Sequence, residues 1–273
     1  MNERVLNPLF GPPPPRVQLD AAPLVRVLAQ VQFAKIVKIA EEKHIGDFQE
    51  ALRAEYPHLE RDEAKSVQVQ LDHNGVSAST TDEVIWRLLD ASKIWRVSLA
   101  QSAITLETAS YTSRGDFLKR LTAVLSAVAE TLRPSLATRV GFRYVNRLDE
   151  PKDLERLGDL VCAELVGVHT DVLQGQIEHA SSQIGGVTKE GRLLARWGLT
   201  PAGATHDPDM AQPLARPSWL LDIDSFKENA PVEPGFDVAK LVELVDAMAN
   251  RAYSFFRWSV SDAFLERFKG GEV

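Results

Sequence analysis

Strict alternation of apolar and polar residues is the feature that most constrains this chain. From residue 24, one side of an extended backbone carries Val25, Val27, Ala29, Val31 and Phe33, and the other side carries Arg26, Gln30 and Gln32. Residues 137–148, ATRVGFRYVNRL, alternate in the same way, with Val140, Phe142 and Tyr144 opposite Arg139, Arg143 and Arg147. Successive side chains of a strand point to opposite faces, so both stretches predict strands with one buried and one polar face. We expect helices on the apolar face, while the polar face is solvated or meets another surface.

Two similar series of elements follow from the remaining pattern. In the first, a short helix over residues 45–56 precedes strand-like SVQVQLDHNG with a turn at Asn74-Gly75, then the strands EVIWRLLD, KIWRVSLA and AITLETASY. A helix over residues 115–132 ends this series, and Ser113 with Asp116 resembles a capping box at its start. In the second, a helix over residues 151–166 precedes strands in QIEHASSQIGG, GRLLARWGLT and SWLLDIDSF, and a long helix opens near Asp237.

The order of elements predicts an internal duplication. The strands LETASY and LDIDSF, which precede the two long helices, share a leucine followed by an acid and a serine followed by an aromatic ring. We expect an α+β fold of two similarly ordered halves, each an antiparallel sheet with helices on one face, joined about a pseudo-twofold axis. The expected boundaries are a proline-rich arm at 1–22, a first half at 23–135 and a second half at 136–273 with a long C-terminal helix.

Composition narrows the class of protein and its partners. The 273 residues carry a formal charge of −7, which argues against general nucleic-acid binding. No apolar run reaches the roughly 18–20 residues of a membrane span, and the N-terminus lacks a secretion signal, so we expect a cytoplasmic protein with no membrane contact. The single cysteine, Cys162, is expected to be a buried, inert thiol. The segment NPLFGPPPPR predicts a polyproline-like arm along its own domain, or alternatively a ligand for a proline-binding partner.

Arginines on the predicted strands give the main candidate site. Their planar guanidinium groups suit bidentate capture of a carboxylate or phosphate, which would make this face an anion-binding or partner-binding floor. The alternative is a face braced by cross-strand pairs with Glu107, Asp222 and Asp224. The candidate residues of the face are Arg96, Glu107, Arg139, Arg143 and Arg196, with Arg26 in a comparable position.

Other constellations give weaker candidates. Asp222 and Asp224 lie on the same side of one strand and are the only weak candidates for a metal site. The histidines are scattered, and no nucleophile elbow or phosphate-binding loop is present, so we expect neither a cofactor nor a catalytic set. Phe256 and Trp258 on the last long helix are expected to pack in the core, or, if they lie outward, to bind a partner or a second copy.

Several stretches in this order resemble a sporadically distributed bacterial protein family of unknown function. They are PLVRVLAQVQF, IWRVSLAQSAITLETASYTSRGDFLKRL, TRVGFRYVNRL, LLDIDSF and AYSFFRWSVSDAFLERF. The block from Trp95 to Leu121 and the closing Phe256-Arg257-Trp258 with Ser261-Asp262 are the most specific parts. The resemblance implies no catalytic residues, and the patchy occurrence of such a family implies a dispensable role, such as phage defence or toxin neutralisation.

These observations favour a non-enzymatic protein-binding component, whose partner would be a toxin or effector encoded nearby. One alternative is a small-molecule sensor that reads its ligand through Trp86, Trp95, Glu107 and Arg143 in a pocket between sheet and helices. A second alternative is a metal-dependent phosphoesterase that uses Asp222 and Asp224. We also expect a homodimer.

Overall fold

One continuous antiparallel sheet organises the chain in the computed structural model, which describes residues 7–72, 75–168, 173, 176–228 and 235–269. Its nine strands lie in the order β2-β3-β4-β5-β1-β6-β9-β8-β7. The strands are β1 (Leu24–Phe33), β2 (His58–Asp72), β3 (Gly75–Leu89), β4 (Trp95–Ala100), β5 (Ala103–Thr108), β6 (Ala137–Leu148), β7 (Ser182–Val187), β8 (Arg192–Thr200) and β9 (Ser218–Glu228). The α+β class is therefore confirmed.

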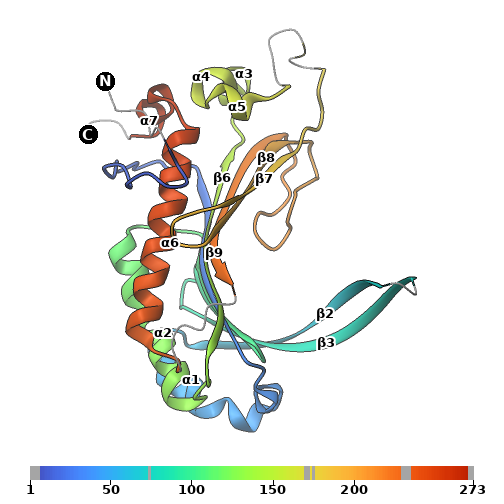
Figure 1. Ribbon diagram of the computed structural model, residues 1–273, viewed down its shortest axis with the longest axis vertical. Helices are drawn as coiled ribbons and strands as arrows, with labels where there is room; N and C mark the ends of the chain where they lie inside the picture. Colours follow the sequence, from blue (N-terminus) through green and yellow to red (C-terminus); the bar gives the residue numbers. More distant parts are fainter. Residues whose placement is uncertain (1–6, 73–74, 169–172, 174–175, 229–234, 270–273) are drawn as a thin grey trace.

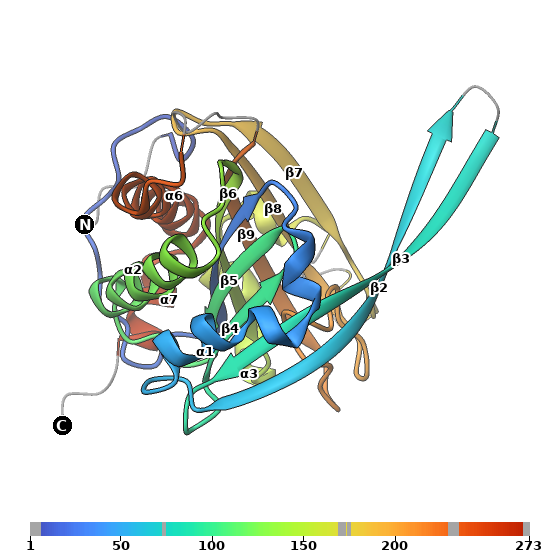
Figure 2. The ribbon, with the colours of Figure 1, turned by 90° about the horizontal axis from the view of Figure 1, so that it is seen from below.

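Helices cover one face of this sheet, and within the described part of the chain no helix covers the opposite face (Figures 1 and 2). The covering helices are α1 (Gly46–Leu52), α2 (Arg114–Thr131) and α6 (Val238–Ser259), with the short 3-10 turns η1 (Val37–Ala40) and η2 (Glu42–His44). At one end of the sheet lie α3 (Pro151–Glu155), α4 (Leu157–Leu160), α5 (Ala163–Val166) and α7 (Asp262–Phe268). The main core lies between the sheet and the covering helices, where aromatic contacts such as Phe117 against Phe142 fill the layer.

The alternating pattern of β1 places its apolar residues in this core from Val27 onward, as predicted. Val25, which was expected on the same side, instead packs against the separate cluster of Val145, Ala211 and Leu220, because the register shifts between Leu24 and Arg26. Val27, Ala29 and Val31 of β1 are completely buried, whereas Arg26 and Gln30 on the other side of the same strand are partly exposed. The helix boundaries also follow the sequence, because the Ser113 hydroxyl accepts a hydrogen bond from the Asp116 amide (3.1 Å) and begins α2. Burial of one face per strand therefore accounts for the register of the sheet.

The helix predicted over residues 151–166 is wrong, because three short helices stand there. The backbone of Arg156 leaves the helical conformation after α3, and Val161 is extended and bridges to Val260 after α4. The Cys162 amide then donates to the Ser259 carbonyl (2.8 Å). Pairing with the end of α6 therefore overrides the helical periodicity of the segment.

The hairpin of β2 and β3 is longer than expected. The two strands pair from His58 with Leu89 to Asp72 with Gly75, so SVQVQLD and EVIWRLL are parts of one long hairpin (Figure 2). Asn74 of the predicted turn lies outside the described residues. The strand predicted in QIEHASSQIGG begins only at Ser182.

The N-terminal arm lies along α6 of its own domain. The Val17 amide donates to the Tyr253 hydroxyl (2.8 Å), and Arg251 donates from Nη1 to the carbonyls of Pro8 (2.9 Å) and Gly11 (3.1 Å). Arg251 also binds Glu190, with its Nε and Nη2 each 2.8 Å from a carboxylate oxygen. The arm is therefore tied to both α6 and the β7–β8 turn.

Candidate functional site: the polar face of the sheet

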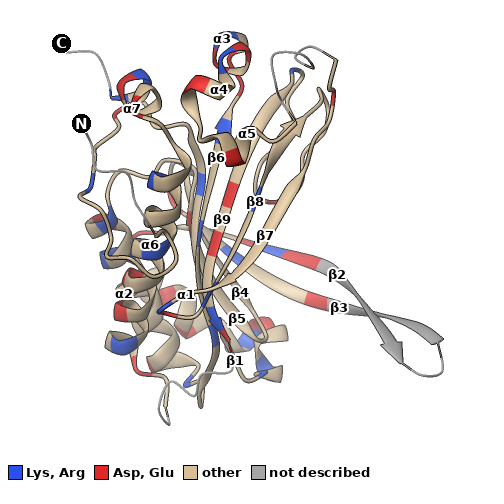
Figure 3. Ribbon diagram, turned by 45° about the horizontal axis from the view of Figure 1, so that its top comes forward, with Lys and Arg blue, Asp and Glu red and all other residues tan. Residues whose placement is uncertain are grey.

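The face of the sheet opposite α1, α2 and α6 is a continuous charged surface, which we name the polar face. Acidic and basic residues lie along its neighbouring strands (Figure 3). The residues that make it up are Arg96 on β4, Thr105 and Glu107 on β5, Arg26 and Gln30 on β1, Arg139, Arg143 and Arg147 on β6, and Asp222 and Asp224 on β9. Each residue reaches this face because it alternates with core residues along its strand.

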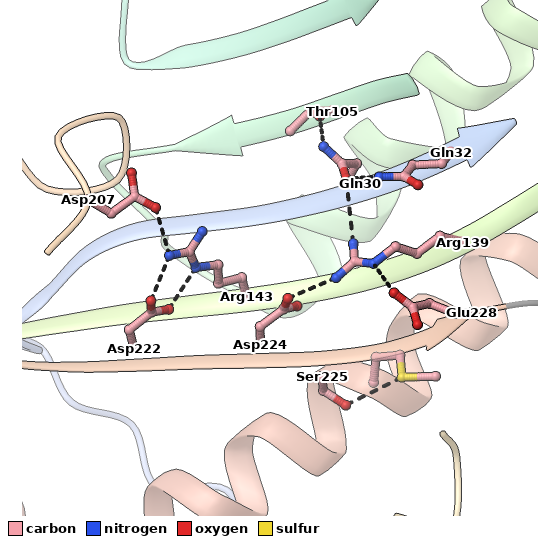
Figure 4. A network of polar contacts seen from close by, with 11 residues as sticks. Gln30, Gln32, Thr105, Arg139, Arg143, Asp207, Asp222, Asp224, Ser225 and Glu228 are labelled. Carbon is pink, nitrogen blue, oxygen red and sulfur yellow. Dashed lines mark hydrogen bonds and ion pairs between the residues drawn. The ribbon is translucent and has the colours of Figure 1, made fainter. Parts of the chain in front are cut away.

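Arg143 lies at the centre of the best-ordered contact. Its Nε and Nη2 donate to the two carboxylate oxygens of Asp222 (2.7 and 2.6 Å), and Nη2 also donates to Asp207 (3.0 Å; Figure 4). By register Arg143 stands opposite Asp224, so it reaches Asp222 diagonally across the two strands. Burial opposes the charge of Arg143, but the hydrogen bonds and attraction of Asp222 and Asp207 outweigh it and raise the pKa of the guanidinium.

Arg139 makes the neighbouring contact, again along a diagonal. Its Nη2 donates to Asp224 (2.8 Å), its Nε lies 3.8 Å from Glu228, and its guanidinium lies 4.6 Å from the centre of the Phe226 ring. Burial raises the pKa of the Asp224 carboxyl above its ordinary value, in spite of the nearby charges of Arg139 and Arg143. The network is therefore partly desolvated although no helix covers it.

Gly141 makes room for the Arg139 side chain. A Cβ atom at Gly141 would lie 2.9 Å from the Arg139 Nη1, which is closer than Cβ atoms in folded proteins approach other heavy atoms, so the end of the Arg139 side chain would have to shift. The arginine then meets uncharged side chains on β1 and β5: Nη1 donates to the Gln30 side-chain oxygen Oε1 (3.5 Å), and the Gln30 Nε2 donates to the Thr105 hydroxyl (3.2 Å). These contacts link β6 to β5 across the centre of the sheet (Figure 4).

Glu107 forms a third centre on the β4 side. Its side chain is only 3% exposed, and it is held in contact with the Arg96 guanidinium and 3.5 Å from Nη1 of Arg26. One buried carboxylate is therefore shared by two arginines from the strands on either side of β5. Arg196 has a different partner, because its Nε donates to the Gln183 side chain (2.7 Å) rather than to a carboxylate among the described residues.

The loop between β8 and β9, residues 201–217, crosses one end of the polar face. Asp207 of this loop reaches Arg143, the Met210 carbonyl accepts from Arg26 Nε (3.5 Å), and the Gln212 carbonyl accepts from Arg147 Nη1 (2.7 Å). The sequence pattern did not reveal Asp207 as part of the site, because nothing in a loop of this length indicates which strand it will lie on.

The structure contains the arginine–acid pairs that one of the two interpretations of the arginines expected. Arg96, Arg139 and Arg143 are paired with the acids Glu107, Asp224 and Asp222, so these three guanidinium groups are engaged within the sheet rather than open. Asp222 and Asp224 each face a different arginine instead of sharing one site. Among the described residues, no group of three or more His, Cys, Asp and Glu side chains is arranged to hold a metal ion.

The remaining candidates lie elsewhere, so they do not join this face. Phe256 is 8% exposed and packs against Phe264, and Trp258 stacks partly buried on Phe255. Phe256 therefore lies in the core, as the first interpretation expected, whereas Trp258 packs against the core and is only partly buried.

The four residues proposed for a small-molecule sensor also separate. Trp86 and Trp95 are buried on the helix side of the sheet, where the Trp86 indole donates to the Ile39 carbonyl (2.7 Å). Glu107 and Arg143 lie on the polar face, so the sheet itself stands between the two pairs. A single pocket lined by all four is contradicted by this arrangement.

Neither the protein-family models nor the curated proteins match this chain. Among the described residues, none of the helices combines the length and the apolar character that crossing a membrane requires.

Proposed function

We propose that this chain is a non-enzymatic binding protein that recognises another protein through the polar face of its sheet. The observation that carries the proposal is a charged network that is already ordered and partly desolvated on a face without helices. Paired charges in such surroundings contribute little net stability, because removing them from water costs about as much as their attraction returns. Ordered arginine and carboxylate groups do, however, give orientation and specificity to a protein interface.

The enzyme and sensor alternatives receive no comparable support. The carboxylates of Asp222 and Asp224 are engaged by Arg143 and Arg139, which leaves them poorly placed to share a cation. A sensor would need a ligand contact other than the four residues first considered, since the sheet separates them.

The biological setting is proposed from the resemblance to a sporadically distributed bacterial family. We propose a cytoplasmic role in phage defence or toxin neutralisation, with a toxin or effector encoded nearby as the partner. A homodimer of this chain remains part of the same proposal.

We also propose that the chain arose by duplication, with the two halves related by a pseudo-twofold axis. The strand order supports it: from the centre outward, β1, β5 and β4 on one side correspond to β6, β9 and β8 on the other. On each side the first strand of the half is central, the last strand lies beside it, and a long helix, α2 or α6, follows.

The test is binding of the protein encoded beside this chain, purified and titrated against wild type and variants by calorimetry. We expect Arg143→Gln and Arg139→Gln each to weaken binding at least tenfold, because each removes a charged, oriented donor from the polar face. The matched control is Arg53→Gln, since Arg53 makes the same two-bond contact with Glu50 (2.7 and 2.9 Å) on the helix side of the molecule.

Two outcomes would count against the proposal. One is a partner that binds with unchanged affinity when both Arg139 and Arg143 are replaced in a folded variant. The other is equal weakening by Arg53→Gln, which would show that the contact does not depend on the polar face.

A further inference from the structure

The β8–β9 loop contains a compact turn that lies on the polar face. The Asp207 carbonyl accepts hydrogen bonds from the amides of Met210 (3.1 Å) and Ala211 (2.9 Å), and its carboxylate Oδ1 accepts from the Asp209 amide (3.2 Å). Pro208 follows Asp207, as at the beginning of many helices. Residues 207–212 therefore form a short, acid-capped turn, which we name the resident turn.

The resident turn uses three donors of the sheet. The Asp207 Oδ2 accepts from Arg143 (3.0 Å), and the carbonyls of Met210 and Gln212 accept from Arg26 (3.5 Å) and Arg147 (2.7 Å). Three arginines thus donate hydrogen bonds to one carboxylate at the start of the turn and to two carbonyls at its end. Any other acid-capped turn of the same shape could present the same three acceptors.

The apolar support beneath the turn is small. Ala211 belongs to a separate cluster of only three buried residues, with Val145 and Leu220, while Met210 packs at its margin. This cluster is distinct from the main core on the other face of the sheet. Burial of one alanine side chain holds a loop far less firmly than a core side chain does.

The docked loop also leaves polar atoms unsatisfied. The Thr205 hydroxyl and the His206 Nε2 are buried without a hydrogen-bond partner. Buried polar atoms without partners lower the stability of the state that buries them. The loop therefore docks on the sheet with two of its buried polar atoms lacking hydrogen bonds, and a segment that binds without this cost could displace it.

We propose that the polar face at Arg26, Arg143 and Arg147 is a docking site for an acid-capped turn of a partner protein, and that the resident turn occupies it as an internal competitor. This inference rests on the proposed function and adds the chemistry of the recognised segment. A tethered competitor acts at an effective concentration of the order of millimolar. A partner must bind the three arginines more favourably than the resident turn does, so partner binding and undocking of residues 207–212 are coupled.

The chain offers a direct probe, which is a labelled peptide of its own residues 204–214, ATHDPDMAQPL. The neck of the loop is closed by a hydrogen bond from the Gly203 amide to the Leu214 carbonyl (2.7 Å). Residues 204–213 can therefore be replaced by an Asn-Gly turn that keeps β8 and β9 paired. Fluorescence anisotropy then compares binding of the peptide to this shortened variant and to wild type.

We expect the shortened variant to bind the peptide at least tenfold more tightly than wild type, because the competitor has been removed. A peptide with Asp207→Asn, and Arg143→Gln in the shortened variant, should each reduce that binding at least tenfold, whereas Arg53→Gln should not change it. Ala211→Glu in the full chain is a second way to undock the turn without shortening the loop, and it should also increase peptide binding.

A folded shortened variant and a folded Ala211→Glu variant that both fail to bind the peptide would overturn the inference. Equal binding of the native and Asp207→Asn peptides would overturn it as well. If the peptide does not bind the shortened variant while Arg143→Gln still abolishes binding of the protein partner, only the role of the resident turn is rejected. The proposed function then stands.

Discussion

The contact between Arg143 and Asp222 gives the sharpest test of why the polar network is there. The perturbation is a double-mutant cycle of Arg143→Met, Asp222→Val and the two together. The side chains are 17% and 15% exposed, so the contact lies between a surface pair, which contributes about 0–1 kcal/mol, and a fully buried one, whose breakage costs about 3–5 kcal/mol. Each single change leaves a partly buried charge without its two short hydrogen bonds, and we expect a loss of about 2 kcal/mol.

The double change should restore most of this loss. Val on a strand and Met beside it are apolar and of suitable size, so the Arg143–Asp222 pair is replaced rather than broken. Asp207 also loses its contact with Arg143, but its side chain is 31% exposed and remains hydrated. The expected stability of the double variant is within about 1 kcal/mol of wild type. The unfolding entropy of 273 residues is about 0.6 kcal/mol per kelvin, so each single variant should melt about 3–4 °C lower and the double variant within about 2 °C of wild type.

Urea unfolding at pH 7 with unchanged m-values, checked by calorimetry, measures these free energies. The same four proteins are titrated with the partner, and the double variant is expected to lose binding while it keeps its fold. A double variant destabilised by the sum of the two single changes would falsify the reasoning, because the network would then be a stabilising brace. Such a result would remove the main argument that the network serves recognition.

Three further outcomes are expected. Arg251→Met should lower the free energy of unfolding by about 3 kcal/mol, since it leaves Glu190 without the guanidinium that binds it. Burial disfavours the charged form of Glu190, but the hydrogen bonds and charge of Arg251 outweigh burial and lower the pKa of Glu190. The pair therefore stabilises the fold above about pH 4.5, and the difference in free energy of unfolding between variant and wild type should shrink as pH falls below about 4.5. A constant difference down to pH 2.5 would contradict this. Burial raises the pKa of Asp224, so the stabilisation from its protonated carboxyl is present at low pH and is lost as pH rises through the raised pKa. Asp224→Asn should therefore be at least as stable as wild type at pH 7 and equal to it near pH 3, as measured by urea unfolding. A loss at pH 7 larger than about 1 kcal/mol would oppose that sign. Burial, with a smaller contribution from Glu164, raises the pKa of the Cys162 thiol to about 11, so its alkylation by iodoacetamide at pH 8 should be about a hundredfold slower than that of free cysteine, and a rate within tenfold would contradict the assignment.

The sequence predicted those parts of the fold that depend on local pattern. Alternation along residues 24–33 and 137–148 predicted which side of β1 and β6 enters the core, because burial of one face leaves a strand a single register. Ser113 predicted the beginning of α2, since a side chain that caps a helix acts within three residues. The acids that pair with the arginines were also predicted as one of two interpretations, because Glu107, Asp222 and Asp224 share the polar side of their strands.

The parts that failed depend on contacts distant in sequence. The helical spacing of Leu154, Leu157 and Leu160 is correct for burial, but the backbone after Leu160 pairs with Val260, which no local pattern encodes. Asp207 could not be assigned to the site, because its position follows from where the β8–β9 loop lies on β6. Trp86 and Glu107 were predicted to share a pocket, but they lie on opposite faces of the sheet, which no local pattern indicates.

Two contacts of the polar face cross the junction between the two halves of the sheet. Gln30 on β1 accepts from Arg139 on β6, and Arg26 on β1 donates to Met210 in the loop between β8 and β9. Both contacts cross the central pairing of β1 with β6, which holds residues 24–33 against residues 137–148. Neither side carries the complete set of donors and acceptors, so the recognition surface is a product of the joined sheet. The β1–β6 pairing therefore sets both the stability of the fold and the geometry that a partner would meet, and a change in its register would alter the two together.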